Sequence, residues 1–70
     1  MADDDDLVNR FTYHAPKGDQ ADRYEHIRRA GLHFAKLVNE YTPPSREQSL
    51  SLTHIEDAVM WANASIARHE

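Results

Sequence analysis

Two aromatic side chains, a histidine and a proline lie within seven residues near the N-terminus of this chain. The stretch reads RFTYHAP, Arg10–Pro16, and is called the leader below; its rings belong to Phe11 and Tyr13. A nucleobase that stacks on such a ring gains about 1–3 kcal/mol. The alternative is that the rings fold back as a lid over apolar surface of the protein itself, because aromatic residues occur more often in cores than in ligand sites. Nothing in the leader has a helical pattern.

Arginine side chains suited to a phosphate accompany these rings. Arg28 and Arg29 are adjacent, and Arg10, Lys17 and Arg46 lie in the leader or close to expected helix starts. A guanidinium group binds a phosphate through two parallel hydrogen bonds. The basic and aromatic residues therefore indicate a binding surface.

The sequence offers no pattern for metal or covalent chemistry. The five histidines form neither an H-x-x-x-H nor an E-x-x-H pair, and they stand at His14, His26, His33, His54 and His69. The chain has no cysteine and no serine between glycines, so no activated nucleophile is indicated. Its two glycines form no phosphate-cradling loop. We expect no metal, no cofactor and no enzymatic activity.

The size of the chain favours an assembly of several copies. Its 70 residues make one domain, and a domain of this length buries only about 60% of its unfolded surface. Small domains usually need disulfides, a metal or partner subunits, and the first two are not expected here. No apolar run reaches the ~18 residues of a membrane span, so we expect a soluble, cytosolic protein.

One acidic run accounts for the net charge of −4. The run is Asp3–Asp6; without it, eight of the twelve acidic residues remain, and they match the eight basic ones. A block of like charges is typical of a solvated tail, so residues 1–9 are predicted to be an acidic tail. The balanced remainder disfavours binding to a DNA or RNA polymer, which requires a basic face.

A first long helix is predicted after the leader. Asp19 is placed to cap it, and Asp22 and Glu25 lie near its start, where acids suit the helix dipole. Its apolar positions alternate in steps of three and four, the spacing of a helix packed along another helix. These positions are Tyr24, Ile27, Gly31, Phe34, Val38 and Tyr41.

Thr42, Pro43 and Pro44 end that helix, and a second one begins with SREQ. Ser45 can accept a hydrogen bond from the backbone of Gln48 while the Gln48 side chain reaches back, which is a capping box. The same three–four spacing then continues through Leu52, Ile55, Val59, Ala62 and Ile66. Two helices of about 23 residues, each roughly 35 Å long, joined by so short a turn must pack antiparallel.

More apolar residues exist than the two stripes use. They lie beside or opposite the stripes and comprise Leu32, Ala35, Leu37, Leu50, Ala58, Met60 and Trp61. Exposed apolar patches of this extent mark interfaces. Gly31 in mid-helix indicates a close backbone approach, or alternatively a ligand. We predict an all-α fold: an antiparallel two-helix hairpin with a non-helical or short-helical leader, assembled into a homo-oligomer.

Four segments together resemble the phage anti-CBASS cyclic-oligonucleotide sponges, whose hairpin also occurs in the related anti-Thoeris sponges. They are FTYHAP at Phe11–Pro16, RYEHIRRA at Arg23–Ala30, PPSREQSLSL at Pro43–Leu52 and AVMWANASIAR at Ala58–Arg68. The resemblance spans about residues 10–68, and the acidic run lies outside it.

This resemblance implies a protein that catalyses nothing and forms a homohexamer. Proteins of the family hold cyclic dinucleotides at one kind of subunit interface and cyclic trinucleotides at another, and thereby keep bacterial anti-phage effectors inactive. It implies action in the cytoplasm of the infected bacterial host, with no membrane partner, and makes residues 10–70 a hairpin nucleotide-binding domain. The alternative is a structural or regulatory phage accessory protein that docks on another protein through its apolar face.

The resemblance also implies roles for individual residues. Tyr13 would stack on the bases of a cyclic dinucleotide and Arg28 would contact its phosphate; a helix start displaced by one turn would give that role to Arg29. The residues expected at the cyclic dinucleotide site are Phe11, Tyr13, His14, Pro16 and Arg28. Arg29 and Arg68 are expected at the cyclic trinucleotide site.

Overall fold

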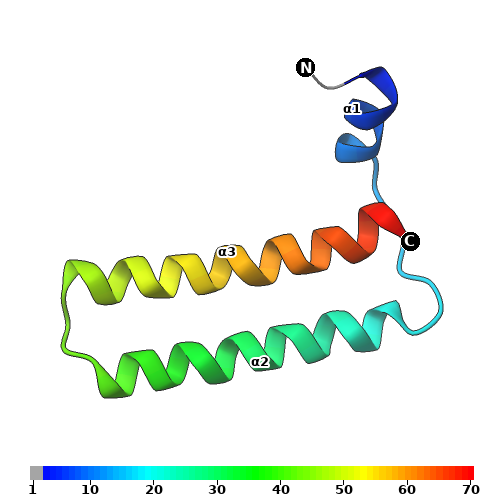
Figure 1. Ribbon diagram of the computed structural model, residues 1–70. Coiled ribbons are helices and arrows are strands. Elements are labelled where there is room, and N and C mark those ends of the chain that lie inside the picture. Colours follow the sequence, from blue (N-terminus) through cyan, green and yellow to red (C-terminus); the bar gives the residue numbers. More distant parts are fainter. Residues whose placement is uncertain (1–2) are drawn as a thin grey trace.

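The computed structural model describes residues 3–70 and contains three helices, α1 (Asp4–Phe11), α2 (Gln20–Tyr41) and α3 (Arg46–His69). Helices α2 and α3 run antiparallel, and α1 stands at the open end of this pair, above the last turns of α3 (Figure 1). There is no strand within residues 3–70. The predicted all-α hairpin is therefore confirmed.

Helix α2 begins where the sequence predicted, but with a different arrangement of hydrogen bonds. Gly18 has a φ of 57°, in the left-handed region that favours glycine, and this turns the chain into the helix. The Asp19 side chain accepts no bond from the helix backbone and instead accepts one from Arg23 Nε at 3.2 Å. The side chain of Gln20, the first residue of the helix, instead binds the turn that precedes it: Gln20 Oε1 accepts a hydrogen bond from the Lys17 backbone N–H at 3.1 Å.

Hydrogen bonds of Ser45 and Gln48 stabilise the turn between α2 and α3. Ser45 accepts from the Gln48 backbone at 3.1 Å, as the capping box predicts. The reciprocal bond is absent, because Gln48 Nε2 instead donates toward the Thr42 carbonyl at 3.0 Å and the Asn39 carbonyl at 3.3 Å. The glutamine thus satisfies carbonyl groups at the end of α2, which have no partner inside their own helix.

The close approach predicted at Gly31 is confirmed. A Cβ atom placed on Gly31 would lie 2.4 Å from Val59 Cγ2, closer than real Cβ atoms come to a neighbour. Around this point the seam between the helices is formed by half-buried residues of the predicted stripes: Ile27, Val38, Leu52, Ile55, Val59, Ala62 and Ile66. Of the residues described, only Gln20 and Tyr24 count as buried.

Two predicted seam residues are not in the seam. Phe34 is 55% exposed and Tyr41 is 75% exposed. A stripe that repeats every seven residues drifts by about 20° per heptad around a straight helix of 3.6 residues per turn. This drift moves Phe34 and Tyr41, which are one heptad apart, toward the edge of the contact with α3, whereas the ring of Tyr24 is buried.

The run Asp3–Asp6, predicted to be a solvated acidic tail, lies at the start of helix α1, and Asp3, Asp4 and Asp5 are exposed there. Asp3 caps α1, with its Oδ1 accepting from the Asp6 backbone N–H at 2.8 Å, and the aspartates form the first turn of the helix. Carboxylates are favourable at a helix N-terminus because they face the positive end of the helix dipole. Arg10 in the last turn pairs with Asp6 at 2.9 Å.

The leader is consequently helical at its start. Arg10 and Phe11 end α1, whereas the chain from Thr12 to Asp19 is not helical. Residues 1 and 2 of the predicted tail lie outside the described part of the chain. The division into residues 1–9 and 10–70 stays a prediction, although its boundary falls within α1.

The hairpin is one helix thick. Only α2 and α3 form it, side by side (Figure 1), and the Cα trace of the chain extends over 44 × 32 × 13 Å. Both broad faces of the hairpin are therefore surface in the single chain. None of the helices within residues 3–70 is both long and apolar enough to cross a membrane.

Candidate functional site

The aromatic rings of the leader project from the molecule. Phe11 is 87% exposed and Tyr13 is 83% exposed, so neither ring covers the hairpin within the chain. Pro16 is also exposed, whereas His14 is half-buried and donates through Nε2 to the Asn9 carbonyl at 3.0 Å. The two rings are thus free to contact a ligand or another subunit.

Hydrogen bonds anchor the leader region to the end of α3 from both sides. On the α1 side, Asn9 Nδ2 donates to the Arg68 carbonyl at 3.0 Å. On the α2 side, Gln20 joins the Lys17 backbone to the Glu70 carboxylate, with 3.1 Å for each bond. These contacts place α1, with Phe11 in its last turn, next to the C-terminal turn of α3.

An ion pair reinforces this end of the hairpin. Arg23 donates from both terminal nitrogens to the two carboxylate oxygens of Glu70, with Nη1 to Oε2 at 2.8 Å. The hydrogen bonds from Arg23, with a further one from Gln20, lower the pKa of Glu70 to about 2. The same carboxylate raises the pKa of Arg23, so both groups are charged at neutral pH.

Arg28 and Arg29 lie on α2, apart from the leader. Both are exposed and pair with Glu25, at 3.7 Å and 3.3 Å respectively. An exposed ion pair contributes only about 0–1 kcal/mol, so each guanidinium group is available to a phosphate. Arg28 lines a groove on one face of the hairpin with Leu32 and Met60, and no leader residue lines that groove.

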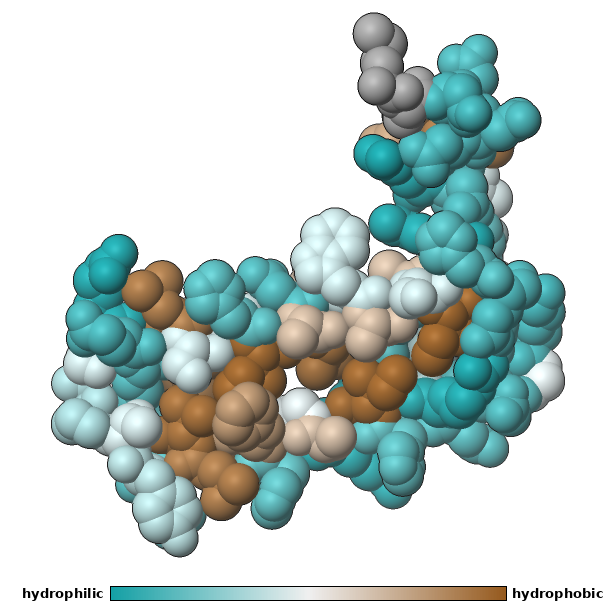
Figure 2. Space-filling model, viewed as in Figure 1, coloured by the Kyte–Doolittle hydropathy of each residue, from teal (hydrophilic) through white to brown (hydrophobic). Residues whose placement is uncertain are grey.

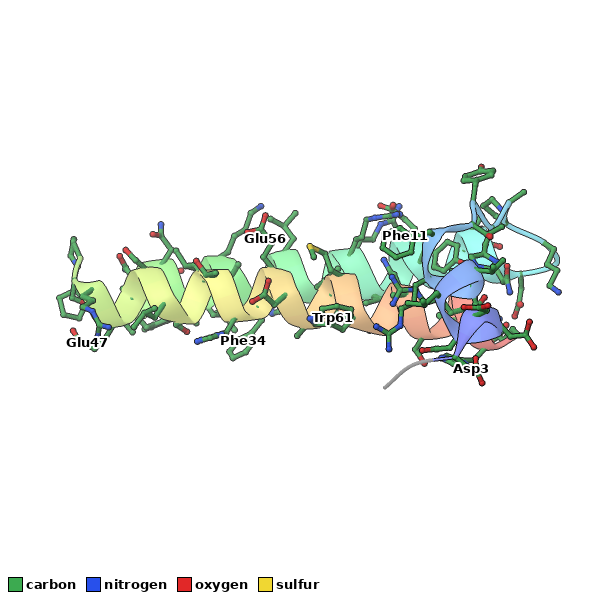
Figure 3. All side chains as sticks on the ribbon, turned by 90° about the horizontal axis from the view of Figure 1, so that it is seen from above. Asp3, Phe11, Phe34, Glu47, Glu56 and Trp61 are labelled. Carbon is green, nitrogen blue, oxygen red and sulfur yellow. The ribbon has the colours of Figure 1, made fainter. Side chains whose placement is uncertain are left out.

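Phe11 and Arg68, predicted for two different sites, lie in one hollow of about 500 Å³ between α1 and the end of α3. The Arg68 guanidinium lies over the Trp61 indole, with its central carbon 5.9 Å from the ring centroid. Figure 3 shows Trp61 on α3 and Phe11 on α1, both on the side of α1 that faces the α2–α3 turn. This α1–α3 hollow is lined by Asp6, Asn9, Arg10, Phe11, Trp61, Arg68 and His69.

Sequence reasoning missed Trp61 and His69 as candidate binding residues. Trp61 was assigned to the apolar surplus, although it stands seven residues before Arg68 and therefore two turns away on the same helix face. This spacing was the available signal. The position of α1 over that face was not visible in the sequence, and Arg29 does not line the hollow that contains Arg68.

The surplus apolar residues gather on the broad faces of the hairpin. Figure 2 shows hydrophobic side chains along the middle of the hairpin, between rims of hydrophilic ones. An apolar groove of about 570 Å³ crosses the two helices between Phe34 on α2 and His54 on α3. Exposed members of the predicted surplus are Leu32, Leu37, Leu50, Ala58, Met60 and Trp61.

Within residues 3–70, no three metal-ligating side chains lie together.

Comparison with known proteins places the chain in a family. The family model described as Acb2/Tad1, hairpin domain, matches residues 3–67, a longer stretch at the N-terminal end than the resemblance indicated. No curated protein and no solved structure matches the chain. The matched family comprises the anti-CBASS and anti-Thoeris sponges, which are binding proteins known for sequestering cyclic oligonucleotides. The all-helical fold agrees with a hairpin domain, and the match covers nearly the whole chain, so this protein belongs to the Acb2/Tad1 hairpin family.

Proposed function

We propose that this protein sequesters cyclic oligonucleotide immune signals, both cyclic dinucleotides and cyclic trinucleotides, without cleaving them. By lowering the free concentration of the signal, it keeps bacterial anti-phage effectors inactive. The observation that carries the proposal is the family match over residues 3–67. The place of action is the cytoplasm of the infected bacterium, where such signals are made.

The cyclic dinucleotide site consists of leader residues and one arginine. Tyr13 and Phe11 provide stacking faces, and their exposure in the single chain supports this role. His14 and Pro16 set the backbone conformation between these two aromatic residues and α2. Arg28 supplies the phosphate contact from the face of the hairpin; because it lies apart from the leader of its own chain, the site requires the leader of a neighbouring subunit.

The cyclic trinucleotide site contains Arg68, and Arg29 is its second arginine. Both are guanidinium groups, which suit phosphodiesters because each can donate two parallel hydrogen bonds. Arg29 is exposed on α2 and Arg68 stands in the last turn of α3. As with Arg28, the two arginines are brought to one ligand by different subunits.

Homo-oligomerisation completes both sites, and a hexamer is the expected assembly. Both the family match and the shape of the chain support an oligomer. The hairpin is one helix thick, and its broad faces are apolar. Burial of such surface stabilises an assembly by about 25 cal/mol per Å². Light scattering at micromolar concentration checks the mass: a multiple of the 8.1 kDa chain is expected, and the mass of one chain contradicts the assembly.

A second candidate function rests on the same apolar faces. The groove between Phe34 and His54 suits a helix of another protein, and the chain would then be a structural or regulatory phage accessory protein. Such a protein would not respond to cyclic nucleotides.

A thermal-shift screen separates the two functions. A ligand that binds only the folded state adds about 2.7 kcal/mol of stability at 100 times its dissociation constant. We expect cyclic di-guanylate or cyclic tri-adenylate to raise the melting temperature, and the linear forms with the same bases to act as controls. Cyclic ADP-ribose variants belong in the same screen. Stabilisation by none of them would favour the accessory protein.

A further inference from the structure

The α1–α3 hollow combines two exposed aromatic rings with two arginines. Trp61 is 61% exposed and Phe11 is 87% exposed, so neither ring contributes to the core of the chain. Arg10 and Arg68 bring the positive charge, and Asp6 pairs with Arg10 at 2.9 Å. The guanidinium group of Arg68 has no carboxylate partner among the ion pairs of residues 3–70.

The position of Arg68 relative to Trp61 leaves its hydrogen-bond donors free. A guanidinium group stacks on an aromatic ring with its flat face and donates N–H bonds from its edge. The guanidinium carbon of Arg68 lies 5.9 Å from the centroid of the indole ring, within the range of a cation–π attraction. Within residues 3–70, Arg68 takes part in a side-chain hydrogen bond only through its backbone carbonyl. The attraction to the ring favours one placement of the long side chain before a ligand arrives, which reduces the ordering cost of binding.

The backbone beneath Arg68 is fixed as well. Its carbonyl accepts the hydrogen bond from Asn9 of α1, at 3.0 Å. The same asparagine lines the hollow. Arg68 is therefore held by a ring on one side and by α1 on the other, an arrangement that suits a binding residue better than a solvated surface arginine.

We propose that the α1–α3 hollow holds one nucleotide unit of the ligand, a role that rests on the proposed function. The edge of Arg68 binds the phosphodiester, and the nucleobase lies against the aromatic wall made by Trp61 and Phe11. Trp61 thereby acts twice, as a stacking surface and as the support that orients Arg68. This makes Trp61 a binding residue rather than a member of the apolar surplus. The exposed ring of Phe11, a stacking face of the proposed cyclic dinucleotide site, would then also contact the ligand of Arg68.

A tryptophan at the ligand can be observed directly, because Trp61 is the only tryptophan of the chain. We propose to titrate the full-length protein with cyclic tri-adenylate and with cyclic di-guanylate, recording its intrinsic fluorescence and the heat of binding in parallel. A base stacked near the indole quenches the emission, and the quenching should saturate at the ligand concentration found by calorimetry. Free N-acetyltryptophanamide under the same titration corrects for light absorbed by the ligand.

The two measurements separate the inference from the proposed function. Binding heat with unchanged fluorescence would overturn the role of the hollow while leaving sequestration intact. No binding heat with any cyclic nucleotide would overturn sequestration and the hollow together. Both signals saturating at the same concentration would support both.

Variants test which property of Trp61 matters. Trp61→Leu removes the stacking surface and should weaken binding about 10-fold or more, and Trp61→Phe, which keeps a ring, should restore most of the affinity. Arg68→Lys keeps the charge but loses the planar edge, and should also weaken binding. Tyr41→Leu is the matched control, since Tyr41 is an exposed aromatic at the far end of α2 and does not line the hollow.

Light scattering on each variant guards against an indirect effect. If Trp61→Leu keeps the mass of the parent protein and loses affinity, the binding role is supported. If it loses mass together with affinity, Trp61 is a subunit contact and the proposal is wrong. Equal affinity of Trp61→Leu and the parent protein would also contradict it.

Discussion

Asn9 on α1 donates a hydrogen bond to the carbonyl oxygen of Arg68 on α3, over a distance of 3.0 Å. The two residues are 59 positions apart in the sequence, and their contact ties the short N-terminal helix to the end of the hairpin. A helix of eight residues such as α1 is marginal in water by itself. Its order therefore depends on contacts of this kind.

The first prediction concerns this tie. Asn9→Ala should cost about 0.5–1.5 kcal/mol, the usual net contribution of one hydrogen bond, and the loss should be local to α1 and the leader. Hydrogen exchange measures it: amides of α1 should exchange faster, whereas those of α2 and α3 should not change. Asn39→Ala, an exposed asparagine of α2, is the control. Unchanged exchange in α1 would contradict the anchoring role of Asn9.

The second prediction concerns the crossing at Gly31. Gly31→Ala should destabilise the hairpin by about 1–3 kcal/mol through overpacking, even though alanine favours a helix by about 1 kcal/mol over glycine. The cause is Val59 Cγ2, 2.4 Å from the new methyl group, and valine is stiff in a helix. Thermal melting of Gly31→Ala, Val59→Ala and the double variant forms a cycle. The double variant should be more stable than the sum of the single losses predicts; additivity would contradict the contact.

The third prediction concerns pH. The pKa of Glu70 falls from 4.5 to about 2 in the folded chain, chiefly through the hydrogen bonds from Arg23. Because the folded pKa is the lower one, the ion pair stabilises fully above pH ~4.5 and its contribution is lost as the pH falls toward 2. A carbon-13 NMR titration of the Glu70 carboxyl group should give a midpoint near pH 2. In Arg23→Ala the midpoint should return toward its usual value, and a parent midpoint above pH 4 would contradict the pair.

The fourth prediction concerns Tyr13. Since Tyr13 is 83% exposed in the single chain, Tyr13→Ala should leave the melting temperature of the free protein nearly unchanged. It should lower the affinity for a cyclic dinucleotide by about 1–3 kcal/mol per stacked base. Arg28→Ala should remove a charge-assisted phosphate contact of roughly 1.5–3 kcal/mol. Calorimetric titration measures the affinity of each variant, and melting curves without ligand measure its stability. For Tyr13→Ala, a lower melting temperature with unchanged affinity would show that Tyr13 has a structural role and not a binding role.

The hairpin was predictable because its signals are local. Pro43 and Pro44 end one helix, Ser45 caps the next, and the three–four spacing on both sides of the turn leaves antiparallel packing as the solution. Even the crossing point was visible, since Gly31 is the single glycine within α2. These features depend on residues close in sequence, which a pattern can identify.

The N-terminal helix and the hollow were not predictable in the same way. The run Asp3–Asp6 has the composition of a solvated block, and only its position in the first turn of α1 makes those charges favourable. The hollow needs Phe11 from α1 and Trp61 from α3 in one place, which depends on the Asn9–Arg68 contact across nearly the whole chain. Helical periodicity carries no information on how a short helix docks. The seven-residue spacing of Trp61 and Arg68, which puts both on one face of α3, was the local sequence signal for this site.

Equilibrium dialysis of the full-length protein against cyclic tri-adenylate and cyclic di-guanylate tests sequestration most directly. The protein compartment is denatured at the end, and the released ligand is identified by chromatography. We expect the cyclic nucleotide to accumulate with the protein, to be recovered intact, and to accumulate less with Tyr13→Ala for the dinucleotide and with Arg68→Ala for the trinucleotide. Equal concentrations of intact cyclic nucleotide on both sides of the membrane, at protein concentrations where the oligomer forms, would contradict the proposed function; recovery of a linear product would contradict holding without cleavage.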